Sequence, residues 1–440
     1  MDRLDNTIRP YAWGSVSAIP RLLGVEPTGQ PQAELWMGAH PGAPSRVDRG
    51  AGPVSLAEVL EADPAGELGE PTVRAFGPRL PFLLKLLAAD SPLSLQVHPD
   101  LAQARAGFDA EEAAGVPPTA PYRNYKDANH KPELICALTP FDGLCGFRPA
   151  ARTAELLDGL DVDQLKPYAD ALRARPEEEA LREVLTAVLS AEPAAMADTA
   201  RRAGAAAAER AAEQGPFAAA YAVYADIARH YPGDPGVLAA MLLNHVTLRP
   251  GEALFLGAGV PHAYLRGLGV EIMANSDNVL RCGLTPKHID VPELLRIVRF
   301  EAGPPGVLRP AADDRDGGEV LDGTQVWDGQ EGAAGTAGAA APAATGEGDP
   351  GKAARSAEDV YETPVSDFRL SRLRLTPGAP ALALPPGAPQ ILLCTAGQAR
   401  LRDATGAELA LAPGDSAYAG AAERLTAAGA GTLFRATVAL

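Results

Sequence analysis

Residues 93–100 read LSLQVHPD, and their alternating pattern after an apolar run predicts a strand that ends at His98. Side chains alternate along a strand, so Gln96 and His98 share one face while Leu95 and Val97 point into a core. An imidazole nitrogen and an amide oxygen side by side suit a divalent cation. On this stretch alone, the simpler interpretation is a buried histidine without a metal, beside a surface glutamine.

The composition is that of an ordinary globular protein. The chain has 440 residues, 46% hydrophobic and 22% charged, which is enough for two or three domains. The net charge of −17 argues against binding to nucleic acid or to anionic membranes, so neither is expected as a partner. It also means that any phosphate-binding pocket must be basic locally. No apolar run has the ~20 residues of a membrane span, and the first residues lack a signal-peptide pattern.

The four cysteines are scattered, with no CxxC pair and no disulfide-framework spacing: Cys136, Cys145, Cys282 and Cys394. This usage indicates reduced thiols and predicts a cytoplasmic protein.

A second metal-capable residue lies in the segment NHKPELICAL at residues 129–138. Pro132 cannot donate a ladder hydrogen bond, so it marks the start of a strand that begins at Glu133. A carboxylate inside an apolar run needs a partner. Lys131 lies two residues earlier on the same face, and a simple ion pair is the alternative to a metal.

A third segment, GVPHAYLRG at residues 259–267, places His262 at the start of another strand. Two imidazoles, one carboxylate and one amide oxygen make a plausible four-ligand zinc shell of Gln96, His98, Glu133 and His262. Because these residues are far apart in the sequence, only a β architecture that brings three strands together unites them.

The rest of the chain divides by composition. Residues 151–245 are rich in Ala, Leu, Glu and Arg at helical spacing and predict an α-helical domain. Residues 306–360 contain an acidic, Gly/Ala/Pro-rich stretch that predicts a linker or disordered loop. Residues 361–440 return to β patterning but contain no histidine, so a similar metal site is not expected there.

Several of these motifs together resemble one family. The segments PYAWGS, LSLQVHPD, NHKPELICAL, GVPHAYLRG and GVEIMANSDNVLRCGLTPKHID are similar to those of the type I mannose-6-phosphate isomerases. The resemblance implies a mainly β fold: a cupin-type double-stranded β-helix, or jelly roll, as the catalytic barrel, with an α-helical insertion and a second, C-terminal cupin-like domain. The catalytic domain is then discontinuous, formed by residues 1–150 plus 246–305, and the C-terminal domain spans 361–440.

The resemblance also implies the chemistry. It assigns one Zn²⁺ per chain to Gln96, His98, Glu133 and His262, and an active-site role to Arg281. The expected reaction interconverts mannose 6-phosphate and fructose 6-phosphate through an enediol, so the expected partner is a small phosphosugar. A monomer is the working expectation, although the sequence does not fix the oligomeric state.

Such an isomerisation needs a base near C1 and C2 and positive charge near the developing oxyanion. Lys131 and Glu271 are competing candidates for the base, and a structural ion pair is an alternative for each. Arg281 is expected to stabilise the enediolate or to assist proton transfer at the hydroxyls. His98 and Asp277 are candidates for the acid and base that open the sugar ring.

The phosphate must meet local positive charge, for which Lys287 and Lys85 are the choices, with a hydroxyl contact from Ser94. The alternative for each lysine is that it is simply a solvated residue at the surface. Trp13 is either a pocket wall or part of the core. Two other functions remain open: an iron oxygenase with two histidines and one carboxylate, and a non-catalytic protein that binds sugar phosphates.

Overall fold

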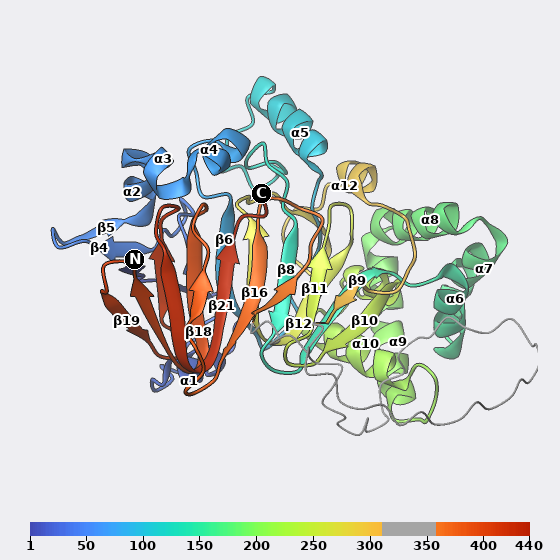
Figure 1. Cartoon of the computed structure of the whole chain (residues 1–440). Helices are drawn as coiled ribbons and strands as arrows, with labels where there is room; N and C mark the ends of the chain where they lie inside the picture. The colour runs from blue at the N-terminus through green and yellow to red at the C-terminus, as the bar shows by residue number, and fades with distance from the viewer. Residues whose placement is uncertain (310–357) are drawn as a thin grey trace, which may run out of the picture.

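The computed structural model describes residues 1–309 and 358–440, and most of the predicted linker at 306–360 lies outside the described residues. Two antiparallel sheets dominate it (Figure 1). The fold is mainly β, as predicted. The larger sheet, here called the N-terminal sheet, does not close into a barrel. Its main path has the order β14-β11-β8-β12-β6-β3-β2. These strands are β2 (Thr7–Arg9), β3 (Glu34–Met37), β6 (Phe82–Ala89), β8 (Glu133–Ala137), β11 (Ala253–Leu256), β12 (His262–Ala274) and β14 (Val307–Leu308).

The long strand β12 belongs to two sets of strands. Its second half pairs with β6 and β8, and its first half pairs with a group that we call the β9 branch. The bend between the halves lies at Gly267, which has φ of 131°, and a Cβ there would approach Phe141 Cα to 2.8 Å. The β9 branch consists of β7 (Leu95–Val97), β9 (Phe141–Phe147), β10 (Leu243–Leu248) and β13 (Leu280–Gly283).

The second sheet, here the C-terminal sheet, has the order β1-β20-β18-β21-β16-β15. Its first strand comes from the start of the chain, because β1 pairs with β20. The two sheets share one hydrophobic core, in which Leu86 and Ile272 meet Leu393 and Phe434. The strands are β1 (Asp2–Arg3), β15 (Glu358–Tyr361), β16 (Arg369–Leu375), β17 (Leu382–Leu384), β18 (Gln390–Asp403), β19 (Glu408–Leu411), β20 (Ser416–Ala419) and β21 (Leu425–Thr437). A separate hairpin joins β4 (Arg46–Asp48) to β5 (Pro53–Ser55).

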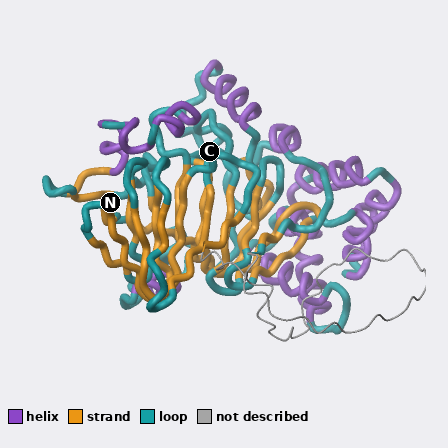
Figure 2. Tube along the Cα trace, in the orientation of Figure 1, coloured by secondary structure: helices purple, strands orange, loops and turns teal. Residues whose placement is uncertain are grey.

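Most helices gather at one end of the molecule, beside the β9 branch (Figure 2). They are α6 (Ala150–Gly159), η1 (Asp163–Leu165), α7 (Lys166–Ala174), α8 (Glu177–Ser190), α9 (Pro193–Ala211), α10 (Ala218–His230), α11 (Gly236–Met241) and α12 (Val291–Ile297). In α8, apolar residues at helical spacing, such as Leu181, Val184 and Val188, form the buried face. Among the described residues, no helix is both long and apolar enough to cross a membrane.

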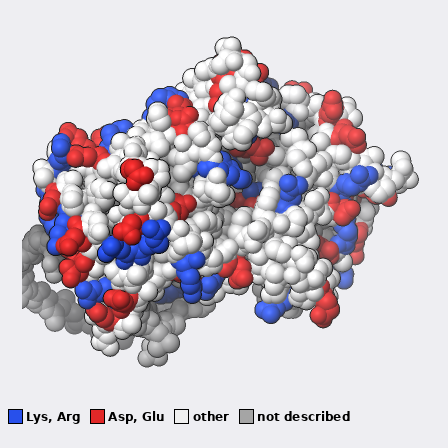
Figure 3. Space-filling view, turned by 180° about the vertical axis from the view of Figure 1, so that it is seen from behind, with Lys and Arg blue, Asp and Glu red and all other residues white. Residues whose placement is uncertain are grey.

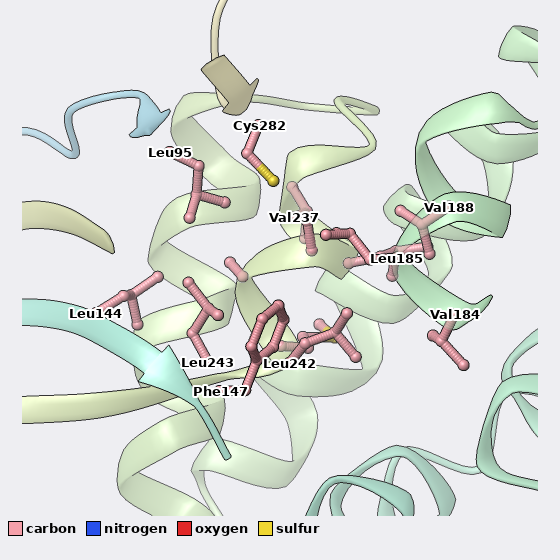
Figure 4. Packing of buried hydrophobic residues seen from close by; sticks show 14 of the residues in the cluster. Leu95, Leu144, Phe147, Val184, Leu185, Val188, Val237, Leu242, Leu243 and Cys282 are labelled. Atoms are coloured by element: carbon pink, nitrogen blue, oxygen red, sulfur yellow. The ribbon is translucent and has the colours of Figure 1, made fainter. Parts of the chain in front are cut away.

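The helices hold the strands that carry the candidate ligands. Leu185 and Val188 of α8 share a core with Leu95 of β7 and Cys282 of β13 (Figure 4). Leu95 and Val97 are fully buried in this core, as their alternation with Gln96 and His98 predicted. The remaining helices are α1 (Ala18–Leu23), α2 (Leu56–Ala62), α3 (Pro64–Leu68), α4 (Glu70–Phe76) and α5 (Leu101–Ala113).

Candidate metal centre and active site

Three of the predicted ligands lie together where β7, β8 and β12 meet. His98 follows β7, Glu133 begins β8 and His262 begins β12, and all three are buried. One ligand atom from each lies within 4.8 Å of the other two. The Nε2 atoms of His98 and His262 are 3.3 and 3.5 Å from the two carboxylate oxygens of Glu133.

The hydrogen bonds on the far sides of the rings decide what this cluster can bind. Nδ1 of His98 lies 2.8 Å from the carbonyl oxygen of Asn278, and Nδ1 of His262 lies 2.9 Å from that of Val260. A carbonyl only accepts, so each Nδ1 carries the proton and each Nε2 presents a lone pair.

Both Nε2 atoms and Oε2 of Glu133 are buried without a hydrogen-bond partner among the described residues. Three buried acceptors that face one another can be satisfied together by one cation. The set of two imidazoles and a carboxylate fits Zn²⁺.

The charge states agree with this arrangement. Burial lowers the pKa of His98 to about 4, so the ring is neutral at pH 7. Burial works against ionisation of Glu133, but the positive charge of Lys131 opposes it, and the pKa of this carboxylate lies well below its usual value. Lys131 forms an ion pair with Glu133 at 3.2 Å. The ion-pair alternative for Lys131 is therefore realised, beside the candidate metal centre.

Gln96 lies beside these residues in the sheet. It is half-buried on β7, and its register partners are His262 on one side and Arg281 of β13 on the other. This places the fourth predicted ligand between the histidine cluster and the predicted active-site arginine.

Lys85 and Glu271 form a second buried group. Nζ of Lys85 is 2.8 Å from Glu271 and 3.6 Å from Glu34, whose other oxygen accepts a hydrogen bond from Trp36 Nε1 at 2.7 Å. Burial opposes the charge of Lys85, but the carboxylates around it raise its pKa well above the usual value. The structure thus places Lys85 between two acids, and a role for it in binding phosphate stays a prediction.

Arg281 lies opposite Gln96 in the sheet, and Lys287 follows it in the exposed loop after β13. Arg281 is half-buried, and its guanidinium has no hydrogen bond or ion pair to any described residue. Burial lowers the pKa of Arg281, and burial together with the charge of Arg281 lowers the pKa of Lys287. Two neighbouring cations that have no anionic partner in residues 1–309 and 358–440 favour an anionic ligand. Elsewhere, the face in Figure 3 carries basic and acidic side chains side by side rather than a continuous basic surface.

The remaining predicted site residues line the surroundings. Ser94 is half-buried just before β7, and Trp13 is half-buried, stacked on Tyr11 at 5.7 Å and packed against the core cluster that contains Tyr264. Asp277 is largely exposed and lies 3.4 Å from Nε2 of His40, whose hydrogen bond lowers the pKa of Asp277.

Sequence reasoning missed two residues that position the site. Asn278 is fully buried; its side chain accepts from the backbone of Lys126 at 2.6 Å and donates to the backbone of Asn129 at 2.8 Å, while its own carbonyl holds His98. Asp234 accepts from the backbone N–H groups of Leu284 and Thr285 at 3.1 Å and so holds the loop after Arg281. The SDN segment at residues 276–278 belongs to a motif quoted above and could have pointed to Asn278. No sequence motif marks Asp234.

The comparisons with known proteins agree with one another. Residues 1–150 match the family model of the phosphomannose isomerase type I catalytic domain. The chain is 39% identical over 438 residues to the mannose-6-phosphate isomerase of Salmonella typhimurium, covering 99% of each chain. It is 46% identical over 310 residues to that of Escherichia coli strain K12, covering 70% of this chain and 77% of the relative.

The solved structures give the same match at the level of the fold. A variant of phosphomannose isomerase from Salmonella typhimurium has a TM-score of 0.84 and 36% identity, with all of both chains covered. A mannose 6-phosphate isomerase bound with zinc and yttrium has a TM-score of 0.82 at the same identity and coverage.

Proposed function

The chain belongs to the mannose-6-phosphate isomerase family, and we propose that it interconverts mannose 6-phosphate and fructose 6-phosphate with one zinc ion bound in the cluster described above. The observation that carries the proposal is the set of three buried lone pairs, on His98, Glu133 and His262, that face one another without a partner among the described residues. The zinc ligands are these three residues together with Gln96. Zinc, when bound, supplies positive charge that stabilises negative charge on the sugar oxygens and orients them.

The proton transfer falls to the residues around the zinc site. An aldose and a ketose interconvert when a proton moves between C1 and C2 through an enediol, which needs a base in its unprotonated form. Lys131 is engaged in an ion pair with Glu133, which commits it to the charge balance of the metal cluster. Glu271 is paired with Lys85 as a carboxylate, and burial raises its pKa toward the working range of a base. We therefore assign the base to Glu271 and a charge-stabilising role to Lys131.

Arg281 and Lys287 supply the positive charge for the substrate. The half-buried guanidinium of Arg281, which has no partner in the described part of the chain, stabilises the enediolate, and Lys287 with Ser94 binds the phosphate. Asp277, kept ionised by His40, accepts a proton during ring opening. Trp13 forms a wall of the sugar pocket.

The fold supports a finer description. The catalytic domain, residues 1–150 plus 246–305, is a cupin-type jelly roll; its support is the strand β12, whose halves pair with different strands on either side of Gly267. Residues 151–245 form the helical insertion, and 361–440 form the second cupin-like domain. The four cysteines are free and buried, which supports a reducing, cytoplasmic location. The protein acts as a monomer, to be tested by light scattering.

The deciding experiment is a coupled assay of the purified full-length chain on mannose 6-phosphate, run with metal analysis. We expect turnover with about one zinc per chain, loss of turnover after chelation and recovery on adding zinc. Turnover in metal-free protein would exclude a need for zinc. Iron in the purified protein with oxygen uptake would favour the oxygenase, and zinc without turnover would favour a sugar-phosphate-binding protein.

A further inference from the structure

A buried hydroxyl beside the zinc site has no part in the mechanism above. Tyr264 lies on β12 two residues after His262, on the same face of the strand, and is 2% exposed. Its hydroxyl has no hydrogen bond of normal geometry to any described residue, and burial together with the nearby carboxylate of Glu271 raises its pKa, so it keeps its proton. Buried tyrosine hydroxyls normally have one, because an unpaired polar group in a dry interior costs free energy.

Other buried tyrosines of the chain follow this rule. The hydroxyl of Tyr224 donates to the carbonyl of Leu243 at 3.1 Å and accepts from Arg148 at 2.6 Å. The hydroxyl of Tyr361 donates to the carbonyl of Gly251 at 2.8 Å. The fold therefore supplies partners to buried phenols, and the unpaired one lies next to the candidate metal centre.

The ring of Tyr264 is fixed in this position by aromatic neighbours. Phe141 packs against it edge to face, with ring centroids 5.4 Å apart and an interplanar angle of 81°. The centroid of His262 lies 6.3 Å away. A rigid ring beside a metal ligand presents its hydroxyl at little entropic cost when a partner arrives.

We propose that Tyr264 is a catalytic residue that donates a hydrogen bond from its hydroxyl to an oxygen at the C1–C2 end of the phosphosugar. This rests on the proposed function, since it assumes a sugar bound at the zinc site. The phenol keeps its proton throughout; it stabilises the oxygen that gains negative charge as Glu271 removes the carbon-bound proton. Substrate thus supplies the partner that the protein leaves out.

The test is Tyr264→Phe, which removes only the hydroxyl, beside the matched variant Tyr224→Phe. We expect Tyr264→Phe to keep its zinc and to melt at or above the wild-type temperature, because it loses an unsatisfied group. Its kcat/KM should fall about 10- to 100-fold, as on loss of one well-placed donor. Tyr224→Phe should show the opposite pattern, a lower melting temperature and unchanged kinetics.

Binding probes separate a sugar contact from other causes. Mannitol 6-phosphate, which has no carbonyl, should inhibit Tyr264→Phe about 3- to 10-fold less well than wild type, as on loss of one neutral hydrogen bond, whereas inorganic phosphate should inhibit both equally. A kcat/KM within twofold of wild type, or a loss of activity that follows a loss of zinc, would overturn the assignment. An inactive zinc-loaded wild type would instead refute the proposed function.

Discussion

The two sheets both bury charged side chains, but they satisfy them differently. In the C-terminal sheet, Arg435 donates to Gln390 at 2.7 Å and pairs with Glu358 at 3.1 Å, and Ser371 donates to the same carboxylate at 2.5 Å. The amide nitrogen of Gln390 in turn donates to the carbonyl of Pro385. Donors and acceptors match within the protein.

The N-terminal sheet buries a cluster in which hydrogen-bond acceptors face one another. The lone pairs of His98, His262 and Glu133 point at one another, and the donors of both rings are used on backbone carbonyls. A self-satisfied polar cluster stabilises a fold, whereas an unsatisfied one is tolerated when a ligand completes it. From this contrast we infer, without reference to any relative, that the cluster of His98, Glu133 and His262 is the one that binds a ligand.

The largest expected effect is at the unsatisfied cluster. Glu133→Gln keeps the size of the side chain but removes its charge, so zinc should fall from about one per chain to a trace. Activity should then fall at least ~10³-fold, or about 4 kcal/mol in the barrier. Metal analysis and the coupled assay measure both. Glu358→Gln in the C-terminal sheet is the matched control and should keep zinc and turnover; equal losses in both variants would erase the distinction between the clusters.

A smaller loss is expected at Arg281. Replacing it with Ala removes the unpaired guanidinium but no metal ligand, so kcat/KM should fall about 10²- to 10³-fold while zinc stays bound. Arg402→Ala, an exposed arginine of the C-terminal sheet, should change kcat/KM less than twofold. Retained activity in Arg281→Ala would refute the role assigned to this residue.

The self-satisfied cluster should respond in stability rather than in activity. Arg435→Met removes a buried guanidinium that pairs with Glu358 and donates to Gln390, and it should lower the free energy of unfolding by about 2–4 kcal/mol, while kcat per bound zinc stays unchanged. Urea unfolding measures the first quantity and the coupled assay the second. A large loss of turnover per zinc would show that the C-terminal sheet shapes the active site.

The sequence predicted the local features of the site well, for physical reasons that act over a few residues. Two-residue alternation placed Gln96 and His98 on one face, and Pro132 marked the start of β8 at Glu133. His262 was predicted to begin a strand and does so; that this strand continues to Ala274 through Gly267 is seen only in the structure.

Features set by long-range pairing were beyond sequence reasoning. The position of Lys85 between Glu34 and Glu271 follows from the register of β6 with β3 and β12, in which Lys85 lies opposite Trp36 and Glu271. The pairing of Asp2–Arg3 with β20 joins the two ends of the chain, and two residues carry no pattern that predicts it. That the hydroxyl of Tyr264 lacks a partner among the described residues follows only from their positions in space.

The smallest expected effect is on the stability of a variant at Asp277. Its pH dependence tests whether this carboxylate, unlike Glu133, is satisfied within the protein. Nδ1 of His40 accepts from Gly42 at 3.0 Å, so Nε2 carries the proton that binds Asp277. This hydrogen bond lowers the pKa of Asp277 in the folded state. Its contribution is complete above the unfolded pKa of about 4 and is lost as the pH falls through the folded value.

Asp277→Asn should therefore be less stable than wild type at pH 6 by less than about 1 kcal/mol, because the carboxylate is more than half exposed. The difference should shrink as the pH is lowered below about 4. Both proteins are compared as metal-free forms, so that protonation of the zinc ligands affects them equally and cancels in the difference. A difference that grows toward low pH would mean that Asp277 is destabilised by its surroundings, and the site would then hold a second unsatisfied carboxylate beside Glu133.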